Sequence, residues 1–106
     1  MGLKELDLKD ISDFKPTIKG KVILDFWADW CMPCSVQMKE LETFSKNNPE
    51  VKVFKIDVEK EEYVDLINHF KISSIPTLLF FNDGELKNKV SGLIRENSIK
   101  EIIEKI

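Results

Sequence analysis

The segment Val22–Gln37 reads VILDFWADWCMPCSVQ, and the organisation of the rest of the chain follows from it. Residues 22–28 are apolar except for Asp25, a pattern typical of a central strand that is covered on both faces, as in a parallel sheet. From Cys34 onward the apolar positions follow helical spacing, at Met38, Leu41, and Phe44 or Ser45. The two cysteines are therefore expected at the junction between a buried strand and a helix.

The position of the cysteines at this junction favours a reactive thiolate. The unpaired N–H groups and the dipole at a helix N-terminus stabilise negative charge, so Cys31 is expected to be accessible and stabilised as a thiolate. Cys34, one turn further, is expected on the packing side, and Pro33 suits the first turn because that position needs no N–H. A structural disulfide, or a metal or iron–sulfur site shared between chains, is the alternative. With two cysteines and His69 this chain cannot complete a zinc site alone.

Length and charge exclude several classes of protein. The 106 residues, 42% of them hydrophobic, predict one domain spanning 1–106. The 16 basic and 19 acidic residues are interspersed, which argues against a nucleic-acid or membrane-surface footprint. Neither a secretory signal nor a membrane-spanning run is recognisable, so a soluble, cytoplasmic protein is expected. We also expect the protein to be a monomer. In a reducing compartment, a Cys-x-x-Cys motif beside a βαβ pattern predicts redox chemistry.

The remaining segments predict a mixed sheet. Residues 3–18 are expected to form a short strand and a poorly formed helix, and the helix after the cysteines is expected to run from about Pro33 to Lys46. A strand at 51–58, parallel to the first, and a helix at 63–70 follow. Residues 77–81 and 85–90 predict a hairpin that turns at Asp83-Gly84.

Asn97 and Ser98 are both candidates for the N-cap of the last helix, and Ser98 with Glu101 matches a capping box. Together these segments predict an α/β fold, with a mixed sheet of four to five strands and helices on both of its faces.

Two motifs carry a family resemblance. FWADWCMPC at 26–34 strongly resembles the active-site signature of thioredoxins, and Ile75-Pro76-Thr77 resembles the cis-proline loop of that family. The resemblance extends from about residue 20 to the C-terminus and implies the thioredoxin fold. It further implies that Cys31 attacks a substrate disulfide and that Cys34 resolves the mixed disulfide. It implies no cofactor beyond the reversible Cys31–Cys34 disulfide, protein disulfides as substrates, and a flavin- or ferredoxin-linked thioredoxin reductase as electron donor.

Asp25 is the candidate proton acceptor. Burial in an apolar strand should raise its pKa and keep the carboxyl partly protonated near neutral pH. Such a group could take the proton from Cys34 through water. The alternative is a structural acid that is hydrogen-bonded or paired with Lys55. Thioredoxins have an acid and a lysine at the matching positions, so the resemblance favours a catalytic role for both residues.

The resemblance also implies a substrate groove. It predicts a cis bond between Ile75 and Pro76, lying against the cysteine pair, with the Ile75 backbone free to pair with an extended substrate. Trp30 has no evident polar partner and is expected to be an exposed docking residue, whereas Trp27 is expected in the core. The match to the family adds Met32, Pro33, Val58, Ser74, Ser91 and Gly92 to the groove.

Ser74 and Ser91 make the rim of this groove more polar than is usual in the family. This difference puts the preferred targets of the protein in question, but not its chemistry. His69 lies near neither motif in the sequence and is expected to be structural.

Two positions depart from the family. Met32 replaces the usual glycine and brings no charge to the dithiol, which predicts a reductant rather than an oxidant. Lys39 replaces a helix-kinking proline, so this helix can run straight. Two other functions stay open at this stage: a specialised reductant with a dedicated target, and a binding module in which redox activity is incidental.

Overall fold

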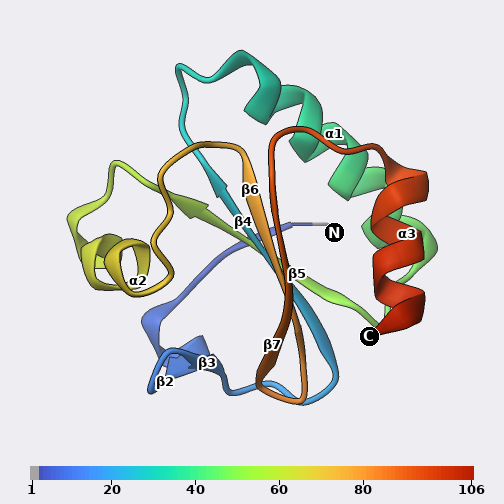
Figure 1. Cartoon of the computed structure of the whole chain (residues 1–106), viewed down its shortest axis with the longest axis horizontal. Helices are drawn as coiled ribbons and strands as arrows, with labels where there is room; N and C mark the ends of the chain where they lie inside the picture. Colours follow the sequence, from blue (N-terminus) through green and yellow to red (C-terminus); the bar gives the residue numbers. More distant parts are fainter. Residues whose placement is uncertain (1–2) are drawn as a thin grey trace.

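The computed structural model describes residues 3–106 and is built around a five-stranded mixed sheet (Figure 1). The strand order is β1-β5-β4-β6-β7. The strands are β1 (Lys4–Glu5), β4 (Lys21–Trp27), β5 (Lys52–Asp57), β6 (Thr77–Asn82) and β7 (Glu85–Ser91). β1, β5 and β4 run parallel, whereas β6 and β7 are antiparallel to their neighbours. The mixed sheet predicted from the sequence is therefore confirmed, and so is the parallel pairing of the two buried strands.

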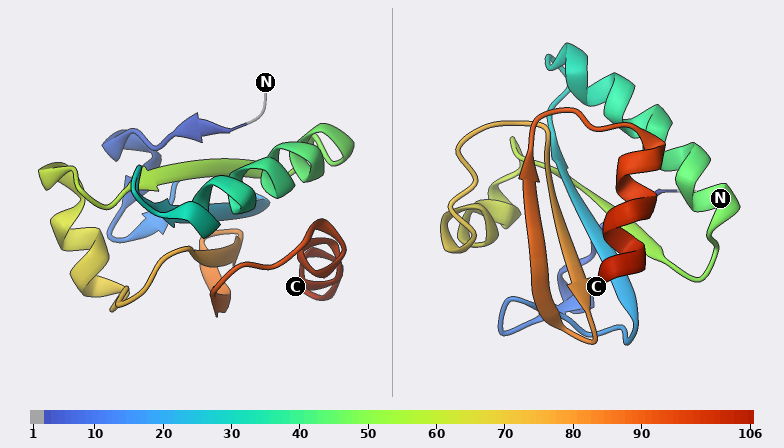
Figure 2. Two further views of the ribbon diagram at one scale, coloured as in Figure 1. Left: turned by 90° about the horizontal axis from the view of Figure 1, so that it is seen from above. Right: turned by 45° about the vertical axis from the view of Figure 1, so that its right-hand side comes forward.

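Helices cover both faces of the sheet. α1 (Met32–Asn47) and α3 (Glu96–Lys105) lie together on one side, and α2 (Val64–His69) lies on the other (Figures 1 and 2). Short 3-10 turns at Leu8–Asp10 and Glu61–Tyr63 complete the helical structure of the described chain. Within residues 3–106, no helix combines the length and the apolar character that a membrane crossing requires.

Side chains of β4 point alternately to the two faces of the sheet and contribute to the apolar core on each face. Val22, Leu24 and Phe26 pack with Tyr63 and Leu66 on the α2 side. Ile23 packs toward α1 and α3, together with Leu41, Phe44, Ile99 and Ile103. Because successive side chains of a strand point to opposite faces, Asp25 points to the same side as Ile23, beneath α1. A carboxyl is thus placed in the apolar layer under the helix that carries both cysteines.

Near the N-terminus the expectation of a poorly formed helix is only partly met. After the 3-10 turn the chain forms a small hairpin, β2 (Ile11–Ser12) and β3 (Lys15–Pro16). Asp13 and Phe14 occupy its turn with φ values of 54° and 61°. The Phe14 ring packs against Phe70 and the core on the α2 side, and this long-range contact stabilises a turn that local sequence does not favour.

The predicted N-cap of the last helix is wrong by two or three residues, because the N-cap is Arg95 rather than Asn97 or Ser98. α3 begins at Glu96, so Asn97 and Ser98 lie inside it and do not cap it. The N–H of Glu96 instead donates to the Glu40 carboxylate of α1 over 2.7 Å. The cap therefore comes from a neighbouring helix, which no pattern local to residues 95–101 could indicate.

Gln37 joins α1 to the segment before α3. Its side chain is fully buried, its amide nitrogen donates to the Ile94 carbonyl over 3.0 Å, and its amide oxygen accepts from the Ile94 N–H over 2.9 Å. The amide thus satisfies both backbone groups of one residue. Gln37 lies on the same buried face of α1 as Cys34, Leu41 and Phe44. A polar residue on this apolar face could have predicted a hydrogen bond to another part of the chain.

Gln37→Leu is expected to lower the free energy of unfolding by about 2–3 kcal/mol, because both backbone groups of Ile94 lose their partner in a partly buried position. Urea denaturation measures this change. Glu42→Leu, an exposed position on the same helix, is the matched control and should stay within about 0.5 kcal/mol of wild type. Equal losses in the two variants would contradict the role given to the Gln37 amide.

Candidate functional site

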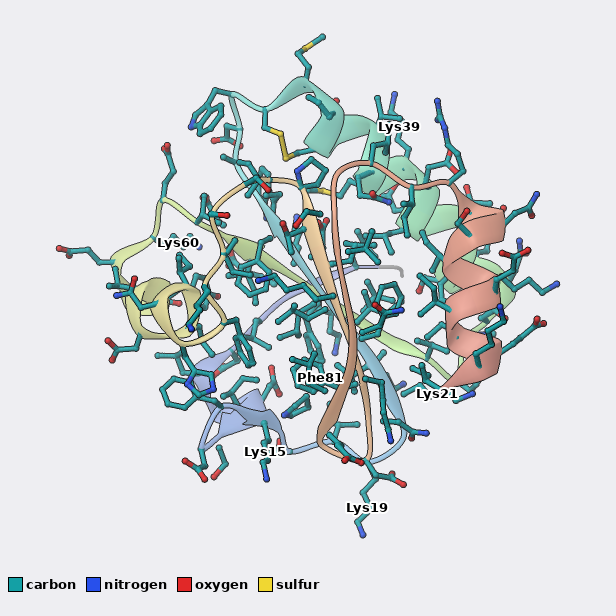
Figure 3. All side chains as sticks on the ribbon, viewed as in Figure 1. Lys15, Lys19, Lys21, Lys39, Lys60 and Phe81 are labelled. Carbon is teal, nitrogen blue, oxygen red and sulfur yellow. A yellow bond between two sulfur atoms is a disulfide. The ribbon has the colours of Figure 1, made fainter. Side chains whose placement is uncertain are left out.

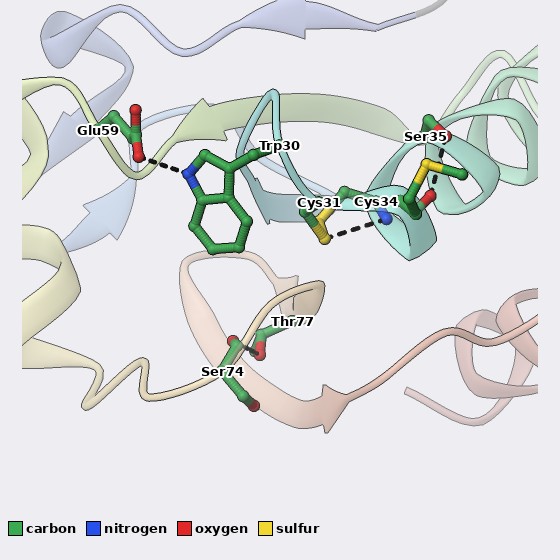
Figure 4. Close-up of a disulfide and its surroundings, with 8 residues drawn as sticks. Trp30, Cys31, Cys34, Ser35, Glu59, Ser74 and Thr77 are labelled. Carbon is green, nitrogen blue, oxygen red and sulfur yellow. Dashed lines mark hydrogen bonds between the residues drawn. A yellow bond between two sulfur atoms is a disulfide. The ribbon is translucent and has the colours of Figure 1, made fainter.

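Cys31 and Cys34 form a disulfide at the N-terminus of α1 (Figure 4). Cys31 is the N-cap residue, and its sulfur accepts a hydrogen bond from the Cys34 N–H over 3.2 Å. Met32 and Pro33 occupy the first helical positions, where the missing N–H of proline costs no hydrogen bond. The junction predicted from the sequence is confirmed, with the Cys31 sulfur in the place where a capping group accepts from the helix.

The two sulfurs differ in access. Cys31 keeps 7% of its surface exposed, whereas Cys34 is fully buried. Both cysteines pack against Ala28, with Trp27, Val58 and Ile75 around them. An external sulfur can therefore approach Cys31, and Cys34 meets only groups inside the protein.

Asp25 is fully buried, and among the described residues neither of its carboxylate oxygens has a hydrogen-bond partner. Burial raises the pKa of this carboxyl to about 7, an effect that the positive charge of Lys55 partly opposes. Asp25 and Lys55 are register partners on adjacent parallel strands, β4 and β5. At neutral pH the group is therefore divided between its protonated and ionised forms, as a proton acceptor must be.

Lys55 does not form an ion pair with Asp25 within the part of the chain that is described. Its Nζ lies 5.5 Å from the centroid of the Trp27 ring, in a cation–π arrangement. Trp27 is half-buried rather than fully in the core, and its indole N–H, inside the protein, lacks a partner among residues 3–106. Lys55 therefore acts on Asp25 through its charge and not through a direct contact.

Trp30 is 67% exposed beside the cysteines, as expected for a docking residue. It also has a polar partner that sequence reasoning missed: its Nε1 donates to the Glu59 carboxylate over 2.5 Å (Figure 4). Trp30 follows β4 and Glu59 follows β5, and the carboxyl ends of adjacent parallel strands meet at one edge of a sheet. The parallel order of β4 and β5 could therefore have predicted that Trp30 and Glu59 lie close together. The contact fixes the orientation of an otherwise solvent-exposed ring.

Glu59→Leu is expected to increase the local motion of the Trp30 ring, because the indole N–H loses its acceptor. In a Trp27→Phe background, time-resolved anisotropy should show a larger fast component in this variant. Glu61→Leu, an exposed acid close by, is the control and should leave the decay unchanged. A decay that Glu59→Leu also leaves unchanged would show that packing alone positions the ring.

The Ile75–Pro76 bond is cis, as the resemblance predicts. Ile75 packs against the cysteine cluster, and in the described structure its backbone takes part in no backbone hydrogen bond. Thr77 begins β6 directly after this loop, and its hydroxyl lies 2.6 Å from the Ser74 carbonyl (Figure 4). A loop with free backbone groups is thus held beside the disulfide by a buried side chain.

The other predicted groove residues lie on the segments around this loop. Met32 is 79% exposed, and Pro33 is exposed beside it. Val58 packs against the cysteine cluster. Ser91 pairs with Thr77 across β6 and β7, and the Gly92 N–H donates to the Pro76 carbonyl over 2.8 Å.

Two further side chains lie away from these segments. His69 stacks on Phe14 with ring centroids 4.0 Å apart, near the Asp83-Gly84 turn, as expected for a structural residue. Lys39 is exposed on α1, which is continuous over 16 residues (Figure 3).

Comparison with known proteins gives one consistent result. A family model described as Thioredoxin matches residues 8–105. The chain is 39% identical over 83 residues to a thioredoxin of Rickettsia bellii, covering 77% of each protein. It is 35% identical over 102 residues to a thioredoxin of Listeria monocytogenes, covering 92% of this chain and 97% of the relative. A crystal structure of chloroplastic thioredoxin z aligns with a TM-score of 0.83 at 26% identity, covering 99% of this chain and 94% of that one.

Proposed function

The chain belongs to the thioredoxin family, and from this premise we propose the part that each residue of its site plays. It is a thiol–disulfide oxidoreductase with a Cys-x-x-Cys redox pair and disulfide reductase activity. Membership also implies disulfide-bonded substrates and a reductase that returns the protein to its dithiol form.

In the first step the Cys31 thiolate attacks one sulfur of a target disulfide. A bond forms between that sulfur and Cys31, the target disulfide breaks, and the other target sulfur leaves as a thiolate. The observation that carries this assignment is the Cys31 sulfur itself: it is partly exposed, caps α1 and accepts the Cys34 N–H. The same N–H would stabilise negative charge on the reduced sulfur.

In the second step Cys34 resolves the mixed disulfide. Its thiol loses a proton and attacks the Cys31 sulfur, which forms the Cys31–Cys34 disulfide and releases the second target thiolate. Two electrons have then passed to the target. Asp25 accepts the Cys34 proton in this proposal, because its pKa of about 7 lets it take up a proton at neutral pH. Lys55 tunes that carboxyl by lowering its pKa.

Substrate contacts are proposed for the exposed segments around Cys31. The free backbone of Ile75 would pair with an extended target segment, and Pro76 and Gly92 hold that edge together through their hydrogen bond. Trp30, Met32, Pro33 and Ser74 supply exposed surface on the segments that flank the pair.

We further propose a single domain that works as a monomer in the cytoplasm, with a flavin- or ferredoxin-linked reductase as donor. The uncharged Met32 supports a reductant, as the family comparison does. A specialised reductant with a narrow set of targets is the second candidate, favoured by the exposed serines of the rim.

The test is reduction of insulin in the presence of dithiothreitol, combined with the equilibrium potential of the Cys31/Cys34 couple. The protein should accelerate insulin precipitation, and the Cys31→Ser/Cys34→Ser double variant should not. The potential should be clearly more reducing than the value of about −180 mV typical of protein disulfide isomerase. A potential near that value would contradict the assignment as a reductant. A clearly reducing potential without any reduction of insulin would favour the specialised reductant.

A further inference from the structure

Two separate pieces of the chain flank the Cys31–Cys34 disulfide, and the target contacts proposed above need both of them. One is the first turn of α1, which carries the cysteines, and the other is the loop that ends at Pro76 (Figure 4). Ile75 packs against the cysteine pair, which gives one contact between the two pieces. An extended target that reacts at Cys31 and pairs with Ile75 spans both pieces, so their separation decides whether both contacts form at once.

A second, polar connection between the two pieces runs through the segment from β7 to α3 (Figure 1). The Gly92 N–H donates to the Pro76 carbonyl over 2.8 Å, so this segment is attached to the loop where it leaves β7. Two residues later, both backbone groups of Ile94 are hydrogen-bonded to the Gln37 side chain of α1. Successive Cα atoms are about 3.8 Å apart, so the two attachments lie within about 8 Å of each other. Residues 92–94 thus form a short bridge between the loop and α1.

The α1 end of this bridge is rigid. The helix is continuous over Met32–Asn47, so its second turn, with Gln37, moves together with the first turn. The Gln37 side chain is fully buried, and moving the bridge away from it would leave both an N–H and a carbonyl without a partner. Glu40, one turn further along α1, accepts from the Glu96 N–H, but that attachment lies beyond the bridge, at the start of α3. Gln37 is therefore the residue that fixes the bridge itself.

We propose that Gln37 is a positioning residue for the reduction of extended targets. It holds residues 92–94 against α1 and thereby fixes the separation between Cys31 and the loop at Ile75 and Pro76. It acts through the backbone of the bridge rather than on the sulfur atoms. This inference rests on the proposed reduction of extended targets at Cys31 with pairing at Ile75. A small disulfide that needs only access to Cys31 does not depend on that separation.

The test compares two oxidants in single-turnover reactions of the reduced protein. Insulin carries its disulfides within a polypeptide, whereas dithiobis(nitrobenzoic acid) is a small aromatic disulfide that needs access to Cys31 alone. Gln37→Met keeps the length of the side chain but removes both of its hydrogen bonds to Ile94. Because the target then loses a well-aligned backbone contact, the second-order rate constant for insulin should fall about two- to tenfold. The rate constant for the small disulfide should stay within a factor of about two.

Hydrogen exchange at the Gly92 amide gives a readout that is independent of activity. This amide donates to Pro76, so its exchange reports whether the bridge remains attached to the loop. Buried amides of β4 report global unfolding and serve for normalisation. After normalisation, Gly92 in the Gln37→Met variant should exchange about tenfold faster than in wild type.

Two further variants complete the design. Ile103→Ala is the control for a general loss of stability, because it opens a cavity in the layer between α1 and α3 but leaves the bridge bonded. It should change neither the ratio of the two rate constants nor the normalised exchange of Gly92. Gln37→Asn keeps an amide but shortens its reach by one methylene group. It should lower the insulin-to-small-disulfide ratio as well, and it provides the test if Gln37→Met does not fold.

An unchanged ratio in Gln37→Met and Gln37→Asn would overturn the proposal. Equal losses with the two oxidants would also overturn it, since Gln37 would then affect the reactivity of Cys31 in general. The same change of ratio in Ile103→Ala would assign the effect to stability instead. A wild-type protein that reduces the small disulfide but not insulin would overturn the proposed general reduction of protein disulfides, and this inference with it. Normal insulin reduction by wild type separates that failure from a failure of Gln37 alone.

Discussion

Cys34→Ser is expected to stop turnover and to leave the protein covalently attached to its target through Cys31. Cys31 is the accessible sulfur and Cys34 is fully buried, so the first attack proceeds but the mixed disulfide has no internal thiol to resolve it. Cys31→Ser is expected to reduce activity to the rate of the buffer thiol alone, without an adduct. Mass spectrometry under non-reducing conditions detects the adduct, and insulin reduction measures the turnover.

Ser35→Ala is the matched control for this pair of variants. Ser35 lies in the same first turn of α1, is exposed, and donates only to the Met32 carbonyl, so this variant should reduce insulin normally. An adduct on Cys34 in the Cys31→Ser variant would reverse the assigned roles. Full turnover in Cys34→Ser would exclude resolution by an internal thiol.

Asp25→Asn is expected to change both stability and rate in a way that depends on pH. The folded carboxyl has a pKa of about 7, against 3.8 for the unperturbed group. Between these two values the native state holds a proton that the unfolded state has released, so wild-type stability falls as pH rises from about 4 to about 7. Above pH 7 both states are ionised and the loss is complete, at roughly 4 kcal/mol.

Asparagine has no such proton, so the difference in free energy of unfolding between variant and wild type should grow across this pH range in favour of the variant. Urea denaturation at several pH values measures it, with the exposed Asp29→Asn as control. A difference that stays constant with pH would contradict the titration assigned to Asp25.

The same variant should slow resolution of the mixed disulfide. In wild type the Asp25 carboxylate takes the Cys34 proton, and general base catalysis of this kind contributes about 10²-fold or more to a rate. Single-turnover reduction followed by tryptophan fluorescence should therefore slow by about that factor at pH 7–8. A gain in stability without this loss of rate would make Asp25 a structural residue only.

Local patterns in the sequence predicted those features that depend on neighbours along the chain. The apolar run ending at the cysteines predicted a central strand followed by a helix, and Asp83-Gly84 predicted a turn with positive φ at both positions, observed at 51° and 81°. The spacing at 63–70 predicted a helix, although the structure begins it with a 3-10 turn and limits α2 to Val64–His69. Each of these depends on residues fewer than about four positions apart, whose geometry the backbone itself fixes.

Family resemblance predicted what local pattern could not. The cis bond before Pro76 is confirmed, although the ordinary expectation for such a bond is trans. The positions of the groove residues followed from matching two motifs that lie 40 and more residues apart in the sequence. Their roles stay predictions.

The sequence by itself determined the redox pair, the order of strands and helices from β4 onward, and the single acid placed in an apolar strand. Only the tertiary structure decided which groups complete the site: Glu59 for the Trp30 ring, Gln37 for Ile94, and Glu40 for the start of α3. The physical reason is that a buried or oriented polar group needs a partner, and folding can supply that partner from any part of the chain. The type of residue shows that a partner is needed, and only the packed structure shows which one it is.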